Sequence, residues 1–538
     1  MDLSLQSVDE VFEVSLRKDD PREDDLGATT QKKCAPCGWL RHWVQVGLIP
    51  GFGLFSESYL LFIFNQVGGP FKKNAPWTTC YDAQRDGYTK LASLVGVVVG
   101  MVIFGLVADR LGRRLGSITT NVLMLLGAIF LTAASPAPFP DGNRQQCDQF
   151  FWWIAVSYFV FGVGVGGEYP LSASIASERT MTKGANAARR GRDVLLTFSC
   201  QGIGQNVGNM IFFFLTVACD AKGTCQEPDT VATNYRVSMG ISIVFLLGLL
   251  PYRITRTESK QYEALKKKQA RDGLEQPGYL TIVKTYGVRL AGTAGSWFLW
   301  DIIMYGNSLF SKEVTTQVNS GLSAVQVTGY TWLYVAVALP GYFLAAFVVD
   351  RPWMGRKRLQ LGGFVLVGFL FFLIGGIMPI LERPENTGIF VFLYCLATFF
   401  YQFGPNSTTF LIPAEVYATP VRARCHGLSA MSGKLGAVVG EQGIAQMLDS
   451  IGLTPMFYIM GAISIAGALT TAFLVPDSRT LDLRAEDQKF VEGWLGKEGA
   501  EKFFERSRRN MDAVDRLKSS LEMSAGDAAA GSPAAARV

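Results

Sequence analysis

Long runs of apolar residues alternate with shorter polar stretches from about residue 45 to residue 475. Most runs hold about 20 residues, the length that an α-helix needs to cross the hydrocarbon core of a bilayer. We place the predicted spans roughly at 45–66, 90–108, 117–135, 150–171, 194–218, 236–252, 288–310, 327–349, 359–380, 388–411, 428–448 and 453–475. The pattern therefore predicts an all-α membrane protein with twelve transmembrane helices.

Lysine and arginine gather in alternate connections between these runs. Basic clusters follow spans two, four, six, eight and ten, whereas the other loops hold far fewer basic residues. By the positive-inside rule, both termini are expected to be cytoplasmic. The chain has 538 residues, 18% of them charged, and a net charge of +5. Because the basic residues lie between spans, we expect a lipid bilayer as the partner and no nucleic acid.

A polar stretch separates six spans from six, which predicts two halves. We expect a cytoplasmic N-terminal tail at 1–43, six-helix halves at 44–253 and 287–476, a linker at 254–286, and a partly disordered tail at 477–538. No apolar signal segment is evident before residue 33, so the first span is expected to direct insertion. A monomer in the plasma membrane is the expected form. Four cysteines, Cys80, Cys147, Cys219 and Cys225, fall in loops predicted outside, where a disulfide can form.

The connections after spans two and eight repeat one pattern. Each has an aspartate, an arginine, a glycine and a further arginine: Asp109, Arg110, Gly112 and Arg113 in the first half, and Asp350, Arg351, Gly355 and Arg356 in the second. Aspartate beside a basic turn can tie neighbouring helices until the two halves move. The repeat resembles the loop motif of the major facilitator superfamily, which implies parallel six-helix halves with a midplane site.

Span four ends in the glycine-rich stretch Gly162 to Gly167, followed by Glu168. Small residues let another helix backbone approach closely in a bilayer. A charge at the centre of a span costs about 2.5–3.5 kcal/mol on insertion scales, so Glu168 is a candidate functional group. The alternative is that Glu168 lies near the helix end and reaches water.

Other polar groups lie inside the spans. Glu57 lies between two serines in span one, and it is either a functional acid or a structural bond to another helix. Gln201 belongs to a polar patch in span five. Trp297, Asp301 and Tyr305 are spaced by four residues, so they share one helix face, turned by about 40° per step.

Span eleven carries Lys434, the basic residue deepest in an apolar run. A buried ammonium needs an anion from the protein or from a transported solute. Asp301 and Glu441 are the candidate protein partners, and phosphate is a solute of suitable charge. In span ten, Pro405 precedes Asn406, whose small polar side chain can meet a ligand.

At these residues the chain resembles the phosphate:proton symporter family of the major facilitator superfamily. The matching motifs are Gly166 to Ser172, Gln201 with Gly202, Trp297 with Asp301, Tyr305 and Gly306, Gly404 to Phe410, Ile412 to Tyr417, and Ser432 to Lys434. The resemblance implies that phosphate is surrounded by Tyr169, Gln201, Trp297, Asp301, Tyr305, Asn406 and Lys434. It also implies that Glu57, Glu168 and Asp301 couple protons, and that Asp109, Arg110, Arg113, Asp350, Arg351 and Arg356 form gating loops.

Three positions depart from the family pattern. Glutamate replaces aspartate at Glu57 and Glu168, and Leu60 replaces a second acid of span one. Phosphate import coupled to protons is the expected function. A glycerophosphodiester or organophosphate permease is the alternative, followed by a phosphate sensor without coupling and a sugar porter. With no nucleophile–base pair and no nucleotide-binding loop, we expect neither an enzyme nor a cofactor or metal.

Overall fold

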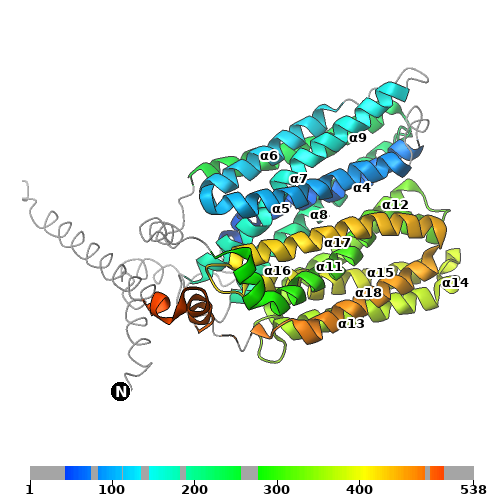
Figure 1. Cartoon of the computed structure of the whole chain (residues 1–538). Coiled ribbons are helices and arrows are strands. Elements are labelled where there is room, and N and C mark those ends of the chain that lie inside the picture. The colour runs from blue at the N-terminus through cyan, green and yellow to red at the C-terminus, as the bar shows by residue number, and fades with distance from the viewer. Residues whose placement is uncertain are drawn as a thin grey trace, which may run out of the picture.

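The computed structural model describes residues 43–73, 83–111, 113–134, 144–181, 190–255, 277–478, 481 and 485–501. These residues form helices joined by turns, without strands. The six helices of the first half are α4 (Ile49–Lys73), α5 (Ala83–Leu111), α6 (Arg113–Ala133), α7 (Arg144–Met181), α8 (Arg190–Asp220) and α9 (Pro228–Thr255). Figure 1 shows them as one group, coloured blue to green.

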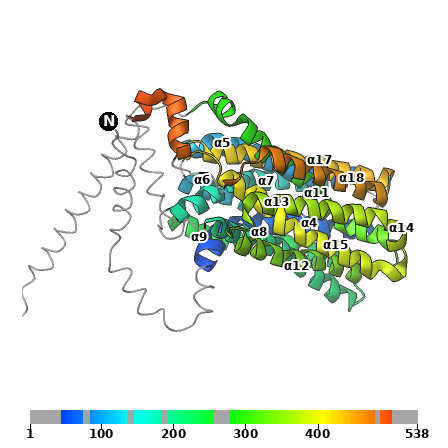
Figure 2. The same cartoon turned by 90° about the horizontal axis from the view of Figure 1, so that it is seen from below.

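The second half begins with the 40-residue helix α11 (Tyr279–Val318). It continues with α12 (Ala324–Val348), α13 (Gly355–Gly376), the short α14 (Met378–Leu381), α15 (Thr387–Tyr401), α16 (Ser407–Leu411), α17 (Arg422–Ser450) and α18 (Leu453–Leu474). The long helices of both halves run roughly along one direction (Figures 1 and 2). Each predicted span corresponds to one of these helices or to the α15–α16 pair, and most helices extend beyond the predicted ends because polar turns continue past the apolar run.

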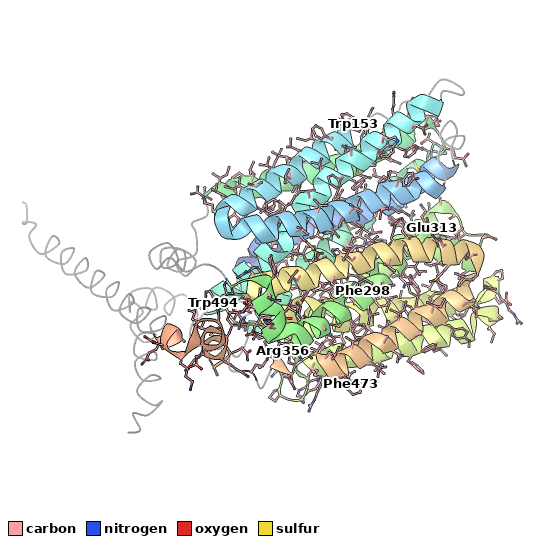
Figure 3. The ribbon with its side chains drawn as sticks, in the orientation of Figure 1. Trp153, Phe298, Glu313, Arg356, Phe473 and Trp494 are labelled. Atoms are coloured by element: carbon pink, nitrogen blue, oxygen red, sulfur yellow. A yellow bond between two sulfur atoms is a disulfide. The ribbon has the colours of Figure 1, made fainter. Side chains whose placement is uncertain are left out.

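The described residues form nine helical segments that are long and apolar enough to cross a membrane on their own. Three long helices, α4, α11 and α17, fall outside that group, and they carry Glu57, Asp301 and Lys434. Trp153 and Phe473 point outward on opposite sides of the bundle (Figure 3), where they are 49% and 80% exposed. Large apolar side chains at the surface are expected where lipid is the solvent.

Glycines of α7 permit close contact with α5, as their pattern predicts. A Cβ added at Gly166 would lie 2.6 Å from the backbone nitrogen of Met101, and one at Gly162 would lie 3.0 Å from that of Val97. Gly100 of α5 faces α7 in the same way. The two halves meet elsewhere, where α8 packs on α12 and α5 packs on α17.

The tenth span is interrupted by a π-helical turn, η5 (Gln402–Asn406), between α15 and α16. Pro405 lies in this turn, and proline cannot donate the backbone hydrogen bond of a regular helix. The Ser407 hydroxyl donates to the Gln402 carbonyl at 2.5 Å, which satisfies one carbonyl of the turn. The turn fixes the position of Asn406, the polar residue predicted to meet a ligand.

A helix within 485–501 packs against the end of the second half, at one end of the bundle (Figure 2). Phe490 stacks on Tyr286 with ring centroids 5.6 Å apart, and Glu486 accepts a bond from Arg289 at 2.9 Å. Asp487 accepts from the Thr419 backbone at 2.7 Å. This part of the tail is therefore ordered against the bundle.

Among the described residues, a disulfide joins Cys219, in the last turn of α8, to Cys225 in the connection before α9. This disulfide pairs two of the four loop cysteines whose pairing the sequence left open. Cys80 and the side chain of Cys147 lie outside the described residues.

Gly363 of α13 touches the π-helical turn, which makes the turn sensitive to one added carbon. A Cβ at Gly363 would lie 2.6 Å from the Gly404 Cα, so backbone must move. We expect Gly363→Ala to destabilise the protein by about 1–3 kcal/mol, as overpacking does. Gly362→Ala is the control, because nothing lies within 4 Å of its Cβ. Thermal unfolding of the purified protein checks this, and equal midpoints for the two variants would contradict the contact.

Candidate functional site

Lys434 of α17 lies buried where α17 packs on α11. Its Nζ donates to the Tyr305 hydroxyl at 2.6 Å and to Asp301 Oδ2 at 3.3 Å. The ammonium also lies 4.2 Å from the Tyr305 ring centroid and 4.8 Å from that of Tyr169. Of the two partners that the sequence left open, Asp301 and Glu441, the structure pairs Lys434 with Asp301.

Close helix packing produces this arrangement. Trp297, Asp301 and Tyr305 lie on the buried face of α11, as their spacing predicts. Opposite them, a Cβ at Gly433 would lie 2.8 Å from Trp297 Cγ, and one at Gly436 would lie 2.9 Å from the Phe298 carbonyl carbon. Any larger residue at these glycines would hold α17 away from α11, and the ammonium away from its partners.

The Tyr169 ring beside Lys434 connects this pair to a set of hydrogen bonds in the first half. The Tyr169 hydroxyl donates to Glu57 Oε1 at 2.7 Å, and Gln201 Nε2 donates to the Tyr169 oxygen at 3.2 Å. Glu57 Oε2 is buried and has no hydrogen-bond partner among the described residues. Glu57 therefore retains capacity for a proton or a further donor.

Asn406 joins the two halves. Its Nδ2 lies 2.9 Å from the Tyr342 hydroxyl, 2.5 Å from Gln402 Oε1 and 3.3 Å from Gln201 Oε1. Its Oδ1 accepts from Trp300 Nε1 at 3.1 Å. Gln201 belongs to α8, whereas the others belong to the second half. The cluster thus spans the contact between halves.

The seven residues predicted to surround phosphate form one connected cluster of hydrogen bonds and ring contacts, which Trp297 joins through the Tyr169 ring at 6.4 Å. Their role in binding stays a prediction. Sequence reasoning missed Trp300, Tyr342 and Gln402. Each is a polar or amphipathic side chain inside an apolar run, and this position was the only feature of the sequence that could have pointed to a role in the site.

Glu168 bonds to residues outside this cluster. The Arg253 guanidinium donates to both carboxylate oxygens of Glu168, at 2.6 and 2.7 Å, and the Thr120 hydroxyl also donates to Glu168. Glu168 and Arg253 are both buried, so the alternative that Glu168 reaches water at a helix end is wrong. Sequence reasoning missed Arg253 as a partner, because Arg253 is the last residue before the predicted linker.

A second charge cluster surrounds Arg356, at the end of the bundle where the C-terminal helix with Trp494 lies (Figure 3). Arg356 contacts Asp350 at 2.7 Å and Glu415 at 2.9 Å. The Arg192 backbone N–H donates to Asp350 at 2.8 Å, and Arg190 donates to the Ala414 carbonyl at 3.0 Å. These bonds connect α8 of the first half to the second half and close this end.

The other residues predicted to form gating loops do not all take part in this cluster. The Arg351 side chain is exposed, while Glu415, which was not predicted to gate, takes part in the cluster. The side chains of Asp109, Arg110 and Arg113 lie outside the described residues. Burial raises the pKa of the Asp350 carboxyl, and the Arg356 guanidinium opposes that shift.

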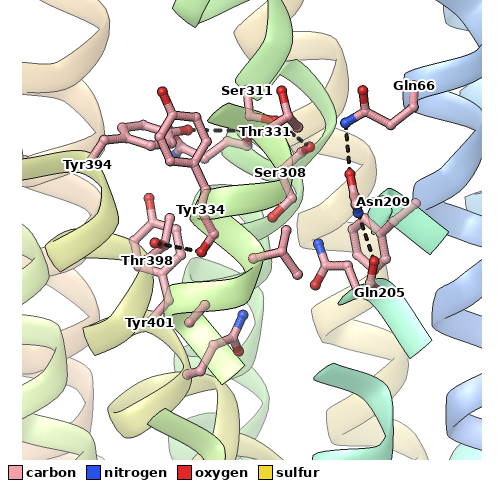
Figure 4. Close-up of a pocket in the computed structure, with 15 residues that line it drawn as sticks. Gln66, Gln205, Asn209, Ser308, Ser311, Thr331, Tyr334, Tyr394, Thr398 and Tyr401 are labelled. Atoms are coloured by element: carbon pink, nitrogen blue, oxygen red, sulfur yellow. Dashed lines mark hydrogen bonds between the residues drawn. The ribbon is translucent and has the colours of Figure 1, made fainter. Parts of the chain in front are cut away.

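A polar chamber lies between the Lys434 cluster and the end of the bundle opposite Asp350. Amides and hydroxyls line it, including Gln66, Gln205, Asn209, Ser311, Thr331 and Thr398. Figure 4 shows Gln66, Gln205 and Asn209 on one side and Tyr334, Tyr394 and Tyr401 on the other. Gln66 Oε1 and the Tyr401 hydroxyl are buried without a partner among the described residues. No charged residue lines the chamber in the described part of the chain.

The model of the family described as sugar (and other) transporter matches residues 55–281 and 301–490. The chain is 29% identical to the probable inorganic phosphate transporter 1-6 of Arabidopsis thaliana, covering 81% of this chain and 91% of that protein. It is 31% identical to the repressible high-affinity phosphate permease of Neurospora crassa, covering 80% and 81%. It is 30% identical to the glycerophosphoinositol permease 1 of Candida albicans, covering 85% and 84%.

Solved structures support the same fold. The major facilitator superfamily proton:xylose symporter XylE, bound to a bromodeoxyglucose, has a TM-score of 0.64 at 16% identity, covering 81% of this chain and 97% of that one. A partially occluded inward-open XylE from E. coli has a TM-score of 0.62 at 18% identity, covering 82% and 100%. Twelve transmembrane helices in two six-helix halves are therefore the fold of this chain.

The buried Glu168–Arg253 pair yields a stability prediction. Arg253→Gln leaves the Glu168 carboxylate buried without its cation, and breaking such a pair costs about 3–5 kcal/mol. Adding Glu168→Gln to this variant removes the unpaired charge, so the double variant should recover most of the lost stability. Unfolding midpoints of the wild type, both single variants and the double variant check the coupling. Additive losses in the double variant would mean that the two side chains act independently.

Proposed function

Because this chain belongs to the sugar (and other) transporter family, we propose that it imports inorganic phosphate together with protons by alternating access. One observation carries the choice of substrate: a buried ammonium, Lys434, is held by Asp301 and Tyr305 next to the contact between the halves. A neutral sugar has no use for such a cation. The names of the similar phosphate transporters support the same substrate.

In the proposed cycle, phosphate replaces Asp301 as the counter-ion of Lys434. Asp301 then faces an anion instead of a cation, which favours its protonated form. A protonated Asp301 donates a hydrogen bond to phosphate, whereas a carboxylate repels it. We assign the Tyr305 hydroxyl and the Asn406 amide to the remaining phosphate oxygens.

Glu57 is the proposed first proton acceptor. Its free Oε2 and its bond to Tyr169 connect it to the Lys434 site. Leu60 leaves the first span without a second acid. Glu168 stays a candidate for proton coupling, and its bidentate bond to Arg253 ties it within the first half.

Alternating access requires the two ends of the bundle to open in turn. The bonds of Arg190 and Arg192 to Ala414 and Asp350 cross between the halves, so opening that end breaks them. We assign this end to the cytoplasm, since the basic connections lie there. Plasma-membrane location, cytoplasmic termini and a monomeric state belong to the same proposal.

A glycerophosphodiester permease is the second candidate function. The uncharged chamber favours it, because amides and hydroxyls suit the hydroxyl groups of an alcohol such as glycerol or inositol. Gln66 Oε1 and the Tyr401 hydroxyl have bonding capacity to spare there. The similar Candida albicans permease is named for such an ester.

Binding measurements on Lys434 variants test the substrate. We expect Lys434→Ala to weaken equilibrium binding of radiolabelled phosphate at least about thirtyfold, because the site loses its ammonium. Lys434→Arg should retain part of the binding, since it keeps the charge but changes a compact ammonium into a planar fork. Lys284→Ala, which removes an exposed lysine of α11, is the control.

Competition on the same samples separates the candidate substrates. Unlabelled phosphate should displace the label, and glucose should not. Displacement by glycerophosphoinositol at far lower concentration than by phosphate would favour the ester permease. If Lys434→Ala binds phosphate as tightly as the wild type, Lys434 is a structural residue and the anion argument is wrong.

A further inference from the structure

Tyr342 of α12, which sequence reasoning missed, lies where the two halves meet at the site. Its side chain is 1% exposed. The hydroxyl accepts from Asn406 Nδ2 of the second half at 2.9 Å and donates to Gln201 Oε1 of the first half at 3.3 Å. In the described part of the chain, that Gln201 oxygen is the only acceptor of the Tyr342 O–H. The hydroxyl thus connects two residues that are predicted to surround phosphate.

These two bonds belong to a chain of five hydrogen bonds that all point one way. An indole N–H can only donate, so the bond of Trp300 to Asn406 fixes the direction of every later bond. In order of donation, the chain runs from Trp300 Nε1 to Asn406 Oδ1, from Asn406 Nδ2 to the Tyr342 oxygen, from the Tyr342 O–H to Gln201 Oε1, from Gln201 Nε2 to the Tyr169 oxygen, and from the Tyr169 O–H to Glu57 Oε1.

The direction of this chain turns the amide nitrogen of Gln201 toward the Lys434 site. Gln201 Nε2 donates one hydrogen to Tyr169, whose ring centroid lies 4.8 Å from Lys434 Nζ. An amide nitrogen carries two hydrogens, and the second one has no partner among the described residues. That hydrogen is therefore a donor for a phosphate oxygen held at Lys434. With the amide flipped, Gln201 would present an acceptor oxygen instead, which repels phosphate.

We propose that Tyr342 is a positioning residue for phosphate, which acts by holding the Gln201 amide with its nitrogen toward Lys434. This inference rests on the proposed transport of phosphate or a phosphate ester. Asn406 Nδ2 also lies 3.3 Å from Gln201 Oε1, but its two hydrogens have nearer acceptors in Gln402, at 2.5 Å, and in Tyr342. Because Tyr342 and Gln201 belong to different halves, the amide is oriented only while the halves are packed together here.

Equilibrium binding of radiolabelled phosphate to the purified full-length protein tests this role. Tyr342→Phe removes the hydroxyl and keeps the ring, so we expect a Kd at least about fivefold higher in protein with a wild-type unfolding midpoint. Tyr235→Phe is the matched control, because it removes another buried hydroxyl, which donates to the Leu131 carbonyl at 2.8 Å within the first half. The Kd of this control should equal that of the wild type.

A double-variant cycle separates positioning from a general packing defect. Gln201→Leu removes the amide, and binding should remain measurable because Lys434 is retained. If Tyr342 acts through Gln201, then Tyr342→Phe should weaken binding no further once Gln201→Leu is present. A purely structural defect would instead add in full.

A second variant moves Tyr342 without removing its hydroxyl. A Cβ at Gly202 of α8 would lie 2.5 Å from Tyr342 Cε2, so Gly202→Ala must displace the ring. We expect this variant to raise the Kd severalfold, and to have no such effect beside Gln201→Leu. Gly248→Ala is its control, because nothing lies within 4 Å of the added Cβ.

Binding of both phosphate and glycerophosphoinositol to each variant identifies the source of the phosphate group. A wild type that binds neither compound refutes the proposed function. If the wild type binds one of them, and Tyr342→Phe and Gly202→Ala bind it as tightly, only the role of Tyr342 is refuted. Full additivity with Gln201→Leu refutes that role as well.

Discussion

Burial of the Lys434 ammonium is the constraint on which the centre of this protein depends. An uncompensated charge at this depth is costly, so a carboxylate, a phenol and two aromatic rings surround it. That environment requires α17 to press against α11, which the glycines Gly433 and Gly436 permit. In the proposed cycle, phosphate takes the place of Asp301 beside this cation.

Three groups of polar contacts differ in what they connect. Glu168 and Arg253 both belong to the first half, and Asp301 and Lys434 both belong to the second. Neither pair needs to break when the halves move as rigid bodies. The contacts of α8 with Asp350 and Ala414 do cross between halves. In the proposed cycle, reorientation therefore opens one end without disturbing the central cation, and the partner of that cation changes only when phosphate arrives.

Much of this architecture follows from local patterns in the sequence. The apolar runs predicted the helices, the glycines at Gly162 and Gly166 predicted a close approach by another helix, and the four-residue spacing placed Trp297, Asp301 and Tyr305 on one face. These features depend on periodicity within a single helix, which a sequence displays directly. The sequence did not predict that Lys434 pairs with Asp301 instead of Glu441, because this choice depends on how two distant helices are rotated.

Residues at predicted boundaries were the hardest to interpret. Arg253 and Lys90 each lie where an apolar run meets a polar stretch, and such positions usually reach water. The structure buries both because α5 and α9 extend beyond their apolar runs. The interaction of the C-terminal helix with Tyr286 was equally hidden, since it joins segments about 200 residues apart.

Uptake of radiolabelled phosphate into proteoliposomes, with and without an imposed inward proton gradient, tests the central claim most directly. For the wild type, the account predicts accumulation that the gradient drives and a protonophore abolishes. Asp301→Asn keeps the size of the side chain but cannot exchange a proton, so gradient-driven accumulation should be lost. Accumulation by Asp301→Asn at the wild-type rate, with the same response to the gradient, would contradict the exchange of partners at Lys434.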